Sequence, residues 1–267
     1  MASVPDFCPK GAQIMTTVED KTLHRSTKRV LDIFEALANA SEGLTMAEIC
    51  REVNAPKGSL SPILHTMADT SYVAYDDTTK RYSIGLKTYL LGKSFDREST
   101  SISLFMAAMR DVTNACGETC QLGVLDRGRV LYIAKVDSPQ PVRLTSSIGK
   151  TLPIHYTAIG KALVSEMDEE KVRAMLQEPL ERPTDATVRT ADEFIAQLAE
   201  VRNEGFAYDR EEATKAVQCI GIGIRSHGTI QYGLSVTTPS YRLTEDKQAL
   251  IKEALSRAKR HMERMLA

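Results

Sequence analysis

The chain has 267 residues, which is too long for one small domain. Its composition, 42% hydrophobic and 26% charged, excludes wholesale disorder. A balance of 34 Lys and Arg against 35 Asp and Glu gives a net charge of −1, which excludes a polycation that coats nucleic acid or membrane. No apolar run approaches the roughly 20 residues of a membrane span, and the N-terminus lacks the order of a signal peptide. We therefore expect a cytoplasmic protein of two domains, with reduced cysteines and neither metal nor cofactor.

The N-terminal third begins with residues 1–21, which show no sustained period and are expected to form a flexible arm. Three short segments follow, at 30–37, 46–53 and 60–67, each with apolar residues at the spacing of one helix face. The second opens with the capping-box pattern Thr45-Met46-Ala47-Glu48. Three compact helices with short turns between them predict a helix-turn-helix.

Two strand-like pieces, 72–75 and 81–84, come next and are joined by a charged turn, which predicts a β-hairpin. Helices plus such a hairpin indicate a winged helix-turn-helix over residues 22–85. The following pattern, 86–116, is mostly helical. Gly92 and the polar residues 99–101 are expected to divide it into a linker helix, 86–98, and the first helix of a second domain, 99–267.

The second domain alternates strands and helices, which predicts an α+β fold with a largely antiparallel sheet. Thr190 and Glu193 suggest another capping box, and Gly205 is placed to end a helix. The expected strands are 119–125, 130–136, 142–145, 206–209, 216–224 and 230–237, and the expected helices are 157–166, 168–177, 191–203 and 245–266.

Basic side chains of the N-terminal module lie where docked DNA would present phosphates, although residues 21–95 carry an excess of only +2. Polar residues of the third helix are candidate contacts from its exposed face. For any single lysine, a merely solvated surface is the stronger interpretation, whereas the helix-turn-helix and wing taken together favour DNA binding. The candidate DNA-binding residues are Arg25, Lys28, Lys57, Ser59, Ser61, His65, Lys80 and Arg81.

Several segments resemble the IclR family of bacterial transcriptional regulators, in the same order and spacing over about residues 24–262. They are the run from Ser26 to Leu37, the segment from Gly149 to Leu163, and the segment from Gly205 to Glu212. The resemblance implies a winged helix-turn-helix, a linker helix and a GAF-like effector-binding domain, in a homodimer or homotetramer. It also implies double-stranded operator DNA and a small-molecule effector as partners.

The third helix departs from the family pattern, because Pro62 stands where the family usually has Arg, and Gly58 loosens the same turn. Within a helix Pro62 would kink or shorten the element, whereas in a helix that starts near Ser59 or Ser61 it would fall in the first turn at little cost. Both alternatives leave the individual base contacts open.

Position by position, the resemblance implies an effector pocket with an apolar cup and three kinds of polar group. Ser235 and Thr237 lie two apart on one expected strand and therefore share a face. The helix that begins near Thr157 has free N–H groups that suit an anion, so a small organic acid is the expected effector class. The resemblance adds aromatic compounds, which many members of the family sense. The implied residues are Leu144, Leu152, Ala158, Ile159, Asp209, Val217, Cys219, Ser235 and Thr237.

Two other classes of protein, an enzyme and an adaptor, are alternatives to a regulator. An enzyme has little support, because Ser147 and Lys150 match only the short Ser-x-x-Lys spacing and no complete nucleotide-binding or metalloprotease motif occurs. A protein-interaction adaptor without specific DNA binding is the alternative, motivated by Pro62 and the small basic excess. The sequence favours a ligand-responsive regulator and identifies neither its effector nor the sign of regulation.

Overall fold

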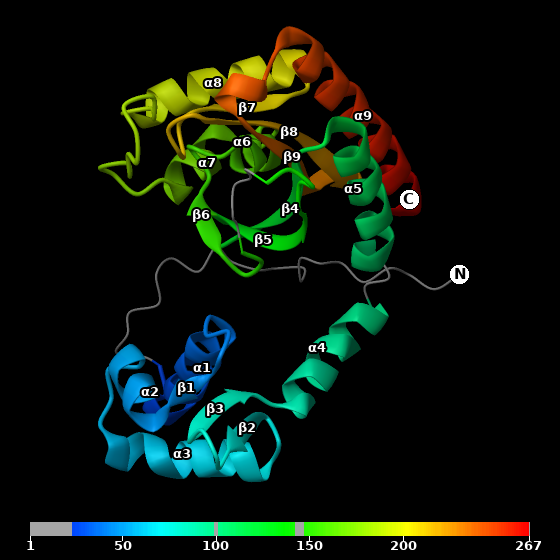
Figure 1. Cartoon of the computed structure of the whole chain (residues 1–267). Coiled ribbons are helices and arrows are strands. Elements are labelled where there is room, and N and C mark those ends of the chain that lie inside the picture. The colour runs from blue at the N-terminus through cyan, green and yellow to red at the C-terminus, as the bar shows by residue number, and fades with distance from the viewer. Residues whose placement is uncertain (1–22, 99–100, 142–146, 267) are drawn as a thin grey trace. The chain divides into compact units, whose positions relative to one another are not determined.

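The computed structural model describes residues 23–98, 101–141 and 147–266 and divides the chain into two compact units, residues 1–99 and 100–267 (Figure 1). The expected arm, residues 1–21, lies outside the described residues. Within the described ranges, no helix is long and apolar enough to cross a membrane.

The N-terminal unit is a winged helix-turn-helix. Helices α1 (Arg25–Ala38), α2 (Met46–Glu52) and α3 (Lys57–Asp69) surround a core that includes Ile33, Ile49 and Leu60. The wing is formed by β2 (Val73–Asp76) and β3 (Arg81–Ile84), and a two-residue strand, β1 (Leu44–Thr45), completes the sheet in the order β1-β3-β2. The sequence pattern did not predict β1, which is too short to show a period.

The start of α2 has the predicted capping box. The Thr45 hydroxyl accepts from the Glu48 backbone N–H, and the Glu48 carboxylate accepts from the Thr45 backbone N–H at 2.8 Å. Glu48 also meets Arg81 of the wing, with 3.3 Å between Oε2 and Nη1. One carboxylate thus ties α2 to β3, which fixes the wing relative to the helices.

Pro62 lies inside α3 as the sixth residue of the helix, which continues to Asp69. Of the two alternatives that the sequence left open, a start near Ser59 or Ser61 is wrong, because α3 begins at Lys57. The helix also extends well beyond the proline. Pro56, at the N-cap, makes no side-chain cap, and the Ser59 hydroxyl instead donates to the Pro56 carbonyl at 2.8 Å.

The predicted long helical region is present as α4 (Leu86–Glu98) and α5 (Ser101–Cys116). Gly92 lies within α4, so the expectation that it divides the region is wrong: a single exposed glycine weakens a helix without ending it. The residues between the two helices, 99–100, lie outside the described ranges.

The C-terminal unit is built on a six-stranded antiparallel sheet in the order β6-β5-β4-β9-β8-β7 (Figure 1). Its hairpins are β4 (Thr119–Asp126) with β5 (Arg129–Val136) and β8 (Val217–Ser226) with β9 (Thr229–Pro239). The edge strands are β6 (Thr151–Pro153), which the sequence pattern missed, and β7 (Ala207–Arg210). The strand expected at 142–145 lies wholly outside the described residues, which exclude 142–146.

The two faces of this sheet differ in side-chain size. One face carries the large apolar residues Leu122, Ile220 and Leu234 and packs under α5 and α9 (Glu245–Leu266). The opposite face carries Gly123, Gly221 and Gly233, and a Cβ at Gly221 would lie 3.0 Å from the Ala158 carbonyl carbon. These glycines let α6 (Ala158–Val164) approach the strands closely.

Two further helices, α7 (Glu169–Met175) and α8 (Ala191–Glu204), lie on the α6 side of the unit, where Phe194 and Leu198 join a second apolar cluster. The predicted capping box of α8 is half formed. The Thr190 hydroxyl accepts from the Glu193 N–H, but the Glu193 carboxylate accepts from the Arg189 N–H and not from the Thr190 N–H that a capping box requires. Gly205 ends α8 with φ 76°, as its position predicted.

Candidate functional sites

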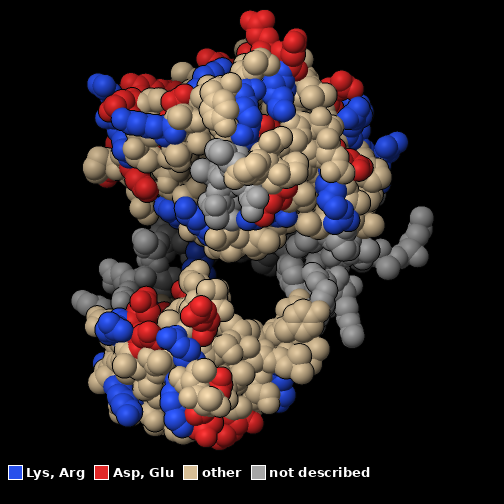
Figure 2. All heavy atoms as spheres, viewed as in Figure 1, with Lys and Arg blue, Asp and Glu red and all other residues tan. Residues whose placement is uncertain are grey.

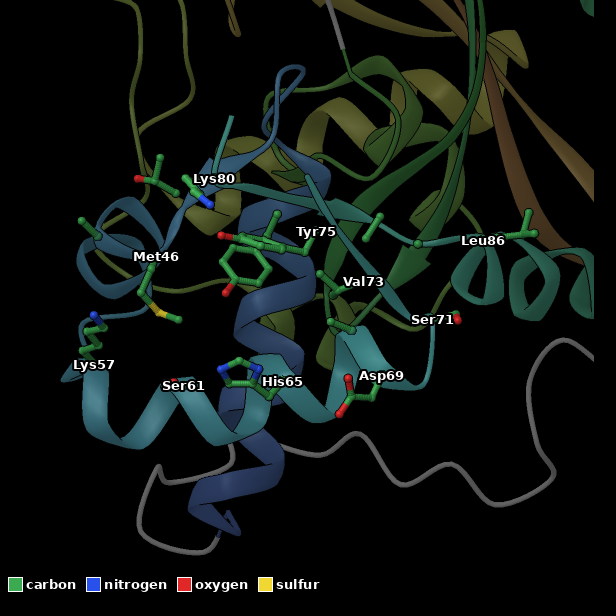
Figure 3. Close-up of a pocket in the computed structure, with 16 residues that line it drawn as sticks. Met46, Lys57, Ser61, His65, Asp69, Ser71, Val73, Tyr75, Lys80 and Leu86 are labelled. Atoms are coloured by element: carbon green, nitrogen blue, oxygen red, sulfur yellow. The ribbon is translucent and has the colours of Figure 1, made fainter. Parts of the chain in front are cut away.

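A groove of about 980 Å³ runs between α3 and the β2–β3 wing of the N-terminal unit. Four candidate DNA-binding residues line it: Lys57, Ser61 and His65 from α3, and Lys80 from the wing turn. Figure 3 shows Ser61 and His65 on the side of α3 that faces Tyr75 of the wing. The structure thus brings together half of the candidates, from segments more than ten residues apart.

The other four candidates lie outside this groove. Arg25 is exposed at the first position of α1, and Lys28 pairs with Asp32 on the same helix at 2.9 Å. Arg81 donates to the Gly43 carbonyl at 2.8 Å and contacts Glu48, so its guanidinium stabilises the fold. Ser59 donates to Pro56 and helps to begin α3.

The N-terminal unit shows no single continuous basic patch on the face seen in Figure 2, where Lys and Arg lie beside Asp and Glu. At the wing tip, Lys80 pairs with Asp77 at 2.5 Å, and both side chains are largely exposed. Such an exposed pair contributes little to stability and can open to meet a phosphate. Any electrostatic attraction to DNA therefore depends on where a few lysines lie.

A cavity of about 200 Å³ in the C-terminal unit lies on the glycine-bearing face of the sheet, next to the start of α6. The lining residues come from segments that are far apart in the sequence, because β4, near the start of the unit, pairs with β9, near its end, in the middle of the sheet. Six of the residues implied by the resemblance line it: Leu152, Ala158, Asp209, Val217, Cys219 and Thr237.

Of the other three implied residues, two are described, and neither of these two lines the cavity. Leu144 lies outside the described residues. Ile159 packs on Gly123 and Gly233, where it holds α6 against the sheet. Ser235 is buried on the same strand face as Thr237, and its register partners are Gln121 and Gly221.

The hydroxyl and thiol groups of the cavity form a short chain of hydrogen bonds. Thr237 Oγ1 donates to Gln121 Oε1 at 2.9 Å, and Cys219 Sγ lies 3.3 Å from Thr237 Oγ1. Burial raises the pKa of the Cys219 thiol well above its ordinary value. Cys219 is therefore a weak hydrogen-bonding group here and not a reactive thiolate.

Asp209 is 2% exposed and provides the acidic group of the cavity. Its Oδ1 accepts from the backbone N–H groups of Glu212 at 2.7 Å and Ala213 at 3.2 Å. Burial raises the pKa of this carboxyl from 3.8 to about 6, against the lowering effect of the two N–H groups. The carboxyl is therefore a polar group that can accept a hydrogen bond from a ligand.

Directly behind Asp209 lies a buried ion pair between Lys161 of α6 and Glu212. Lys161 Nζ donates to Glu212 Oε1 at 2.6 Å and to the Tyr208 carbonyl at 2.7 Å, and both charged side chains are 2% exposed. Burial lowers the pKa of Lys161, and the Glu212 carboxylate opposes this. The pair joins α6 to the turn that also presents the backbone N–H groups to Asp209.

The sequence reasoning missed several residues that line the cavity. Gln121 carried a usable signal, since it is a polar residue within an apolar strand pattern. Lys150 and Tyr132 lie in the cavity because Tyr132 donates its N–H to the Lys150 carbonyl, a pairing that no local pattern reveals. The lining residues not singled out as pocket residues are Gln121, Tyr132, Lys150, Thr157, Ala213 and Thr214.

His155 belongs to a different part of the unit. Its Nε2 contacts the Glu181 carbonyl at 2.8 Å, and its ring lies edge-on to Tyr156. Burial lowers the pKa of this imidazole. The residue therefore orients the loop before α6.

Comparison with known proteins assigns both units. The model of the IclR helix-turn-helix domain matches residues 26–77, and the model of the C-terminal part of the bacterial transcriptional regulator IclR matches residues 100–264. The chain therefore belongs to the IclR family of bacterial transcriptional regulators. This family and the curated relatives are transcriptional regulators, not enzymes.

Among the relatives, the transcriptional regulator KdgR of Dickeya chrysanthemi is 33% identical over 84% of this chain and 73% of its own length. BhcR of Paracoccus denitrificans is 28% identical over 95% of this chain and 91% of its own. A solved IclR regulator from Alicyclobacillus acidocaldarius has a TM-score of 0.82 with 22% identity, covering 92% of this chain and all of that one. This last likeness confirms the winged-helix and GAF-like α+β architecture.

Proposed function

We propose that this regulator binds an operator through α3 and the wing and responds to a small organic acid held in the cavity beside α6. The groove with Lys57, Ser61, His65 and Lys80 carries the DNA part of the proposal, because it offers ammonium groups on both walls to one DNA backbone. We further propose that it acts in the cytoplasm as a homodimer or homotetramer, so that two α3 helices meet successive major grooves.

The effector class follows from the polar groups of the cavity. Lys150 lines the cavity, and its ammonium group has no ion-pair partner among the residues that the structure describes, so it suits a carboxylate. Thr237 and Gln121 offer neutral hydrogen-bonding groups, and Asp209 can accept from a ligand hydroxyl. A small hydroxy acid offers a carboxylate to the Lys150 ammonium group and a hydroxyl donor to the Asp209 carboxyl. An IclR homolog from Microbacterium hydrocarbonoxydans was solved in complex with 4-hydroxybenzoate, which supports this class.

A short helix such as α6 contributes little to anion binding on its own. It has seven residues, and the hydroxyl of Thr157 already accepts from the Gly160 N–H. The carboxylate of the effector is therefore assigned to Lys150 and not to the helix terminus.

The DNA part is tested by fluorescence anisotropy on the protein's own upstream DNA with scrambled competitor. We expect competitor-resistant binding whose affinity falls as salt rises, because bound phosphates release counterions. Changing Lys57 and Lys80 together to alanine should lower affinity for all sequences and flatten the salt slope by about two ion equivalents. Binding that resists salt, or no specific binding, would favour the adaptor instead.

The effector part is tested by calorimetric titration with a panel of small hydroxy acids, starting with 4-hydroxybenzoate. Thr237→Val removes one cavity hydroxyl at nearly constant volume and should weaken the ligand, whereas Ser235→Ala is a matched control on the same strand face. Lys150→Ala should weaken acids more than the corresponding amides. Equal affinities for wild type, Thr237→Val and Lys150→Ala would remove the assignment of this cavity.

A further inference from the structure

The exposed face of α3 has an unusual composition for a helix that reads DNA. Leu60, Leu64 and Met67 are buried in the core of the unit. Because a helix has 3.6 residues per turn, the face opposite the core carries Gly58, Pro62 and Thr66, all of them exposed. The exposed residues His65 and Asp69 line the groove toward the wing.

This outward face offers no guanidinium or ammonium group to base edges. Lys57 is the one Lys or Arg of α3, and it lines the groove toward the wing, where a phosphate is its natural partner. Bidentate contacts from Arg or Lys to guanine are the commonest specific contacts in the major groove. The helix therefore depends on another kind of base contact.

Pro62 lies at the centre of the outward face, with its ring exposed and away from the core. Such an apolar ring complements the C5-methyl group of thymine, which marks T·A pairs in the major groove. Proline also lacks the N–H that would bond to the Gly58 carbonyl in an α-helix. That carbonyl can then accept from an exocyclic amino group of a base.

Close approach of the helix to DNA is possible at the same place. Around Gly58 there is open space, since a Cβ built there would meet nothing within 4 Å. Gly58 and Pro62 lie one helical turn apart on the same face of α3. Because Gly58 has no side chain and Pro62 has a flat ring, the backbone at Gly58 and the ring of Pro62 would be the groups nearest to the bases.

We propose that Pro62 is a specificity-determining residue that reads a thymine methyl group in each operator half-site, with the Gly58 backbone held against the neighbouring base. The inference rests on the proposed docking of α3 in the major groove. It predicts an operator with T·A pairs, and not G·C pairs, at the position under the middle of α3.

The test replaces each thymine of the footprinted operator in turn by deoxyuridine, which removes only the methyl group. Anisotropy titrations with the full-length protein should show one position per half-site at which the wild type loses about fourfold in affinity, as expected for one methyl group taken out of contact. The other thymines should show no loss.

The variant Pro62→Ser removes the ring and restores the backbone N–H, so we expect it to bind thymine and deoxyuridine operators equally. Its N-terminal unit should melt at a higher temperature than wild type, which separates lost reading from lost folding. Lys57→Ala is the matched control: it should weaken both operators equally and keep the fourfold preference.

Two results overturn the inference. Specific binding by the wild type with equal affinity for every deoxyuridine operator would remove the role of Pro62 and leave the proposed function intact. A preference for thymine that persists in Pro62→Ser would assign the reading to another side chain. Absence of all specific DNA binding would instead contradict the proposed function itself.

Discussion

Asp209 links the effector cavity to pH, because its carboxyl is buried and accepts from backbone N–H groups. Lys161, Glu212, Cys219 and Tyr132 are the titratable groups that surround it, and Lys161 is already paired with Glu212. The pKa of Asp209 is about 6 in the folded protein against 3.8 ordinarily. The native state therefore binds more protons than the unfolded state between these values, so stability falls as pH rises from about 4 to about 6.

Asp209→Asn should abolish this dependence, because the amide oxygen can still accept from Glu212 and Ala213 N–H. At pH 4 we expect the two proteins to be nearly equal in stability. At pH 7.5 the variant should be more stable by up to about 3 kcal/mol, given about 1.4 kcal/mol per pKa unit. Urea unfolding at both pH values measures this, and a difference that is constant with pH would contradict it.

The buried Lys161–Glu212 pair should be sensitive to the loss of either partner. Lys161→Met leaves a carboxylate buried alone, and Glu212→Gln leaves an ammonium group, so each should destabilise the unit by about 3–5 kcal/mol. The double variant Lys161→Met, Glu212→Gln should cost less than the sum, since no isolated charge is left. Urea unfolding of the four proteins gives the coupling, and additive losses would show that the pair is not the cause.

Among the elements, α6 depends on the glycines beneath it. Gly221→Val should push α6 away from the sheet, because even a Cβ there would lie 3.0 Å from Ala158. Ala158 also lines the cavity, so we expect weaker effector binding together with lower stability. Gly92→Ala in α4 is a control with open space at the Cβ position, and it should leave effector binding unchanged. Calorimetric titration and thermal unfolding check both variants.

Elements with a strong period could be predicted from the sequence. The last helix was expected at 245–266 and has those bounds, and the strands at 119–125 and 130–136 each extend by one residue. Short pieces such as β6 could not be predicted, because three residues carry no period and β6 exists only through pairing with β5. The cavity residues Tyr132 and Lys150 could not be predicted either, because their place depends on a pairing between distant segments.

In the molecule as a whole, the two units have separate apolar cores among the described residues, with Ile33 and Leu60 in one and Leu122 and Leu234 in the other. We therefore expect two thermal transitions by calorimetry. A bound hydroxy acid should raise only the transition of the C-terminal unit, because a ligand stabilises the state that binds it. Pro62→Ser should raise only the other transition. A single transition that both changes move would contradict independent units.

The central strand pair of the C-terminal sheet, β4 with β9, joins residues that are more than a hundred positions apart, such as Gln121 and Ser235. During synthesis on the ribosome, the DNA-binding unit can fold as soon as residues 23–98 have emerged, whereas the cavity cannot form before β9, the last strand in the described part of the chain. A nascent chain could therefore bind DNA before it could bind the effector. Truncated or stalled products would keep the DNA-binding unit but could not respond to the effector. A cell that relies on this regulator therefore has to remove them.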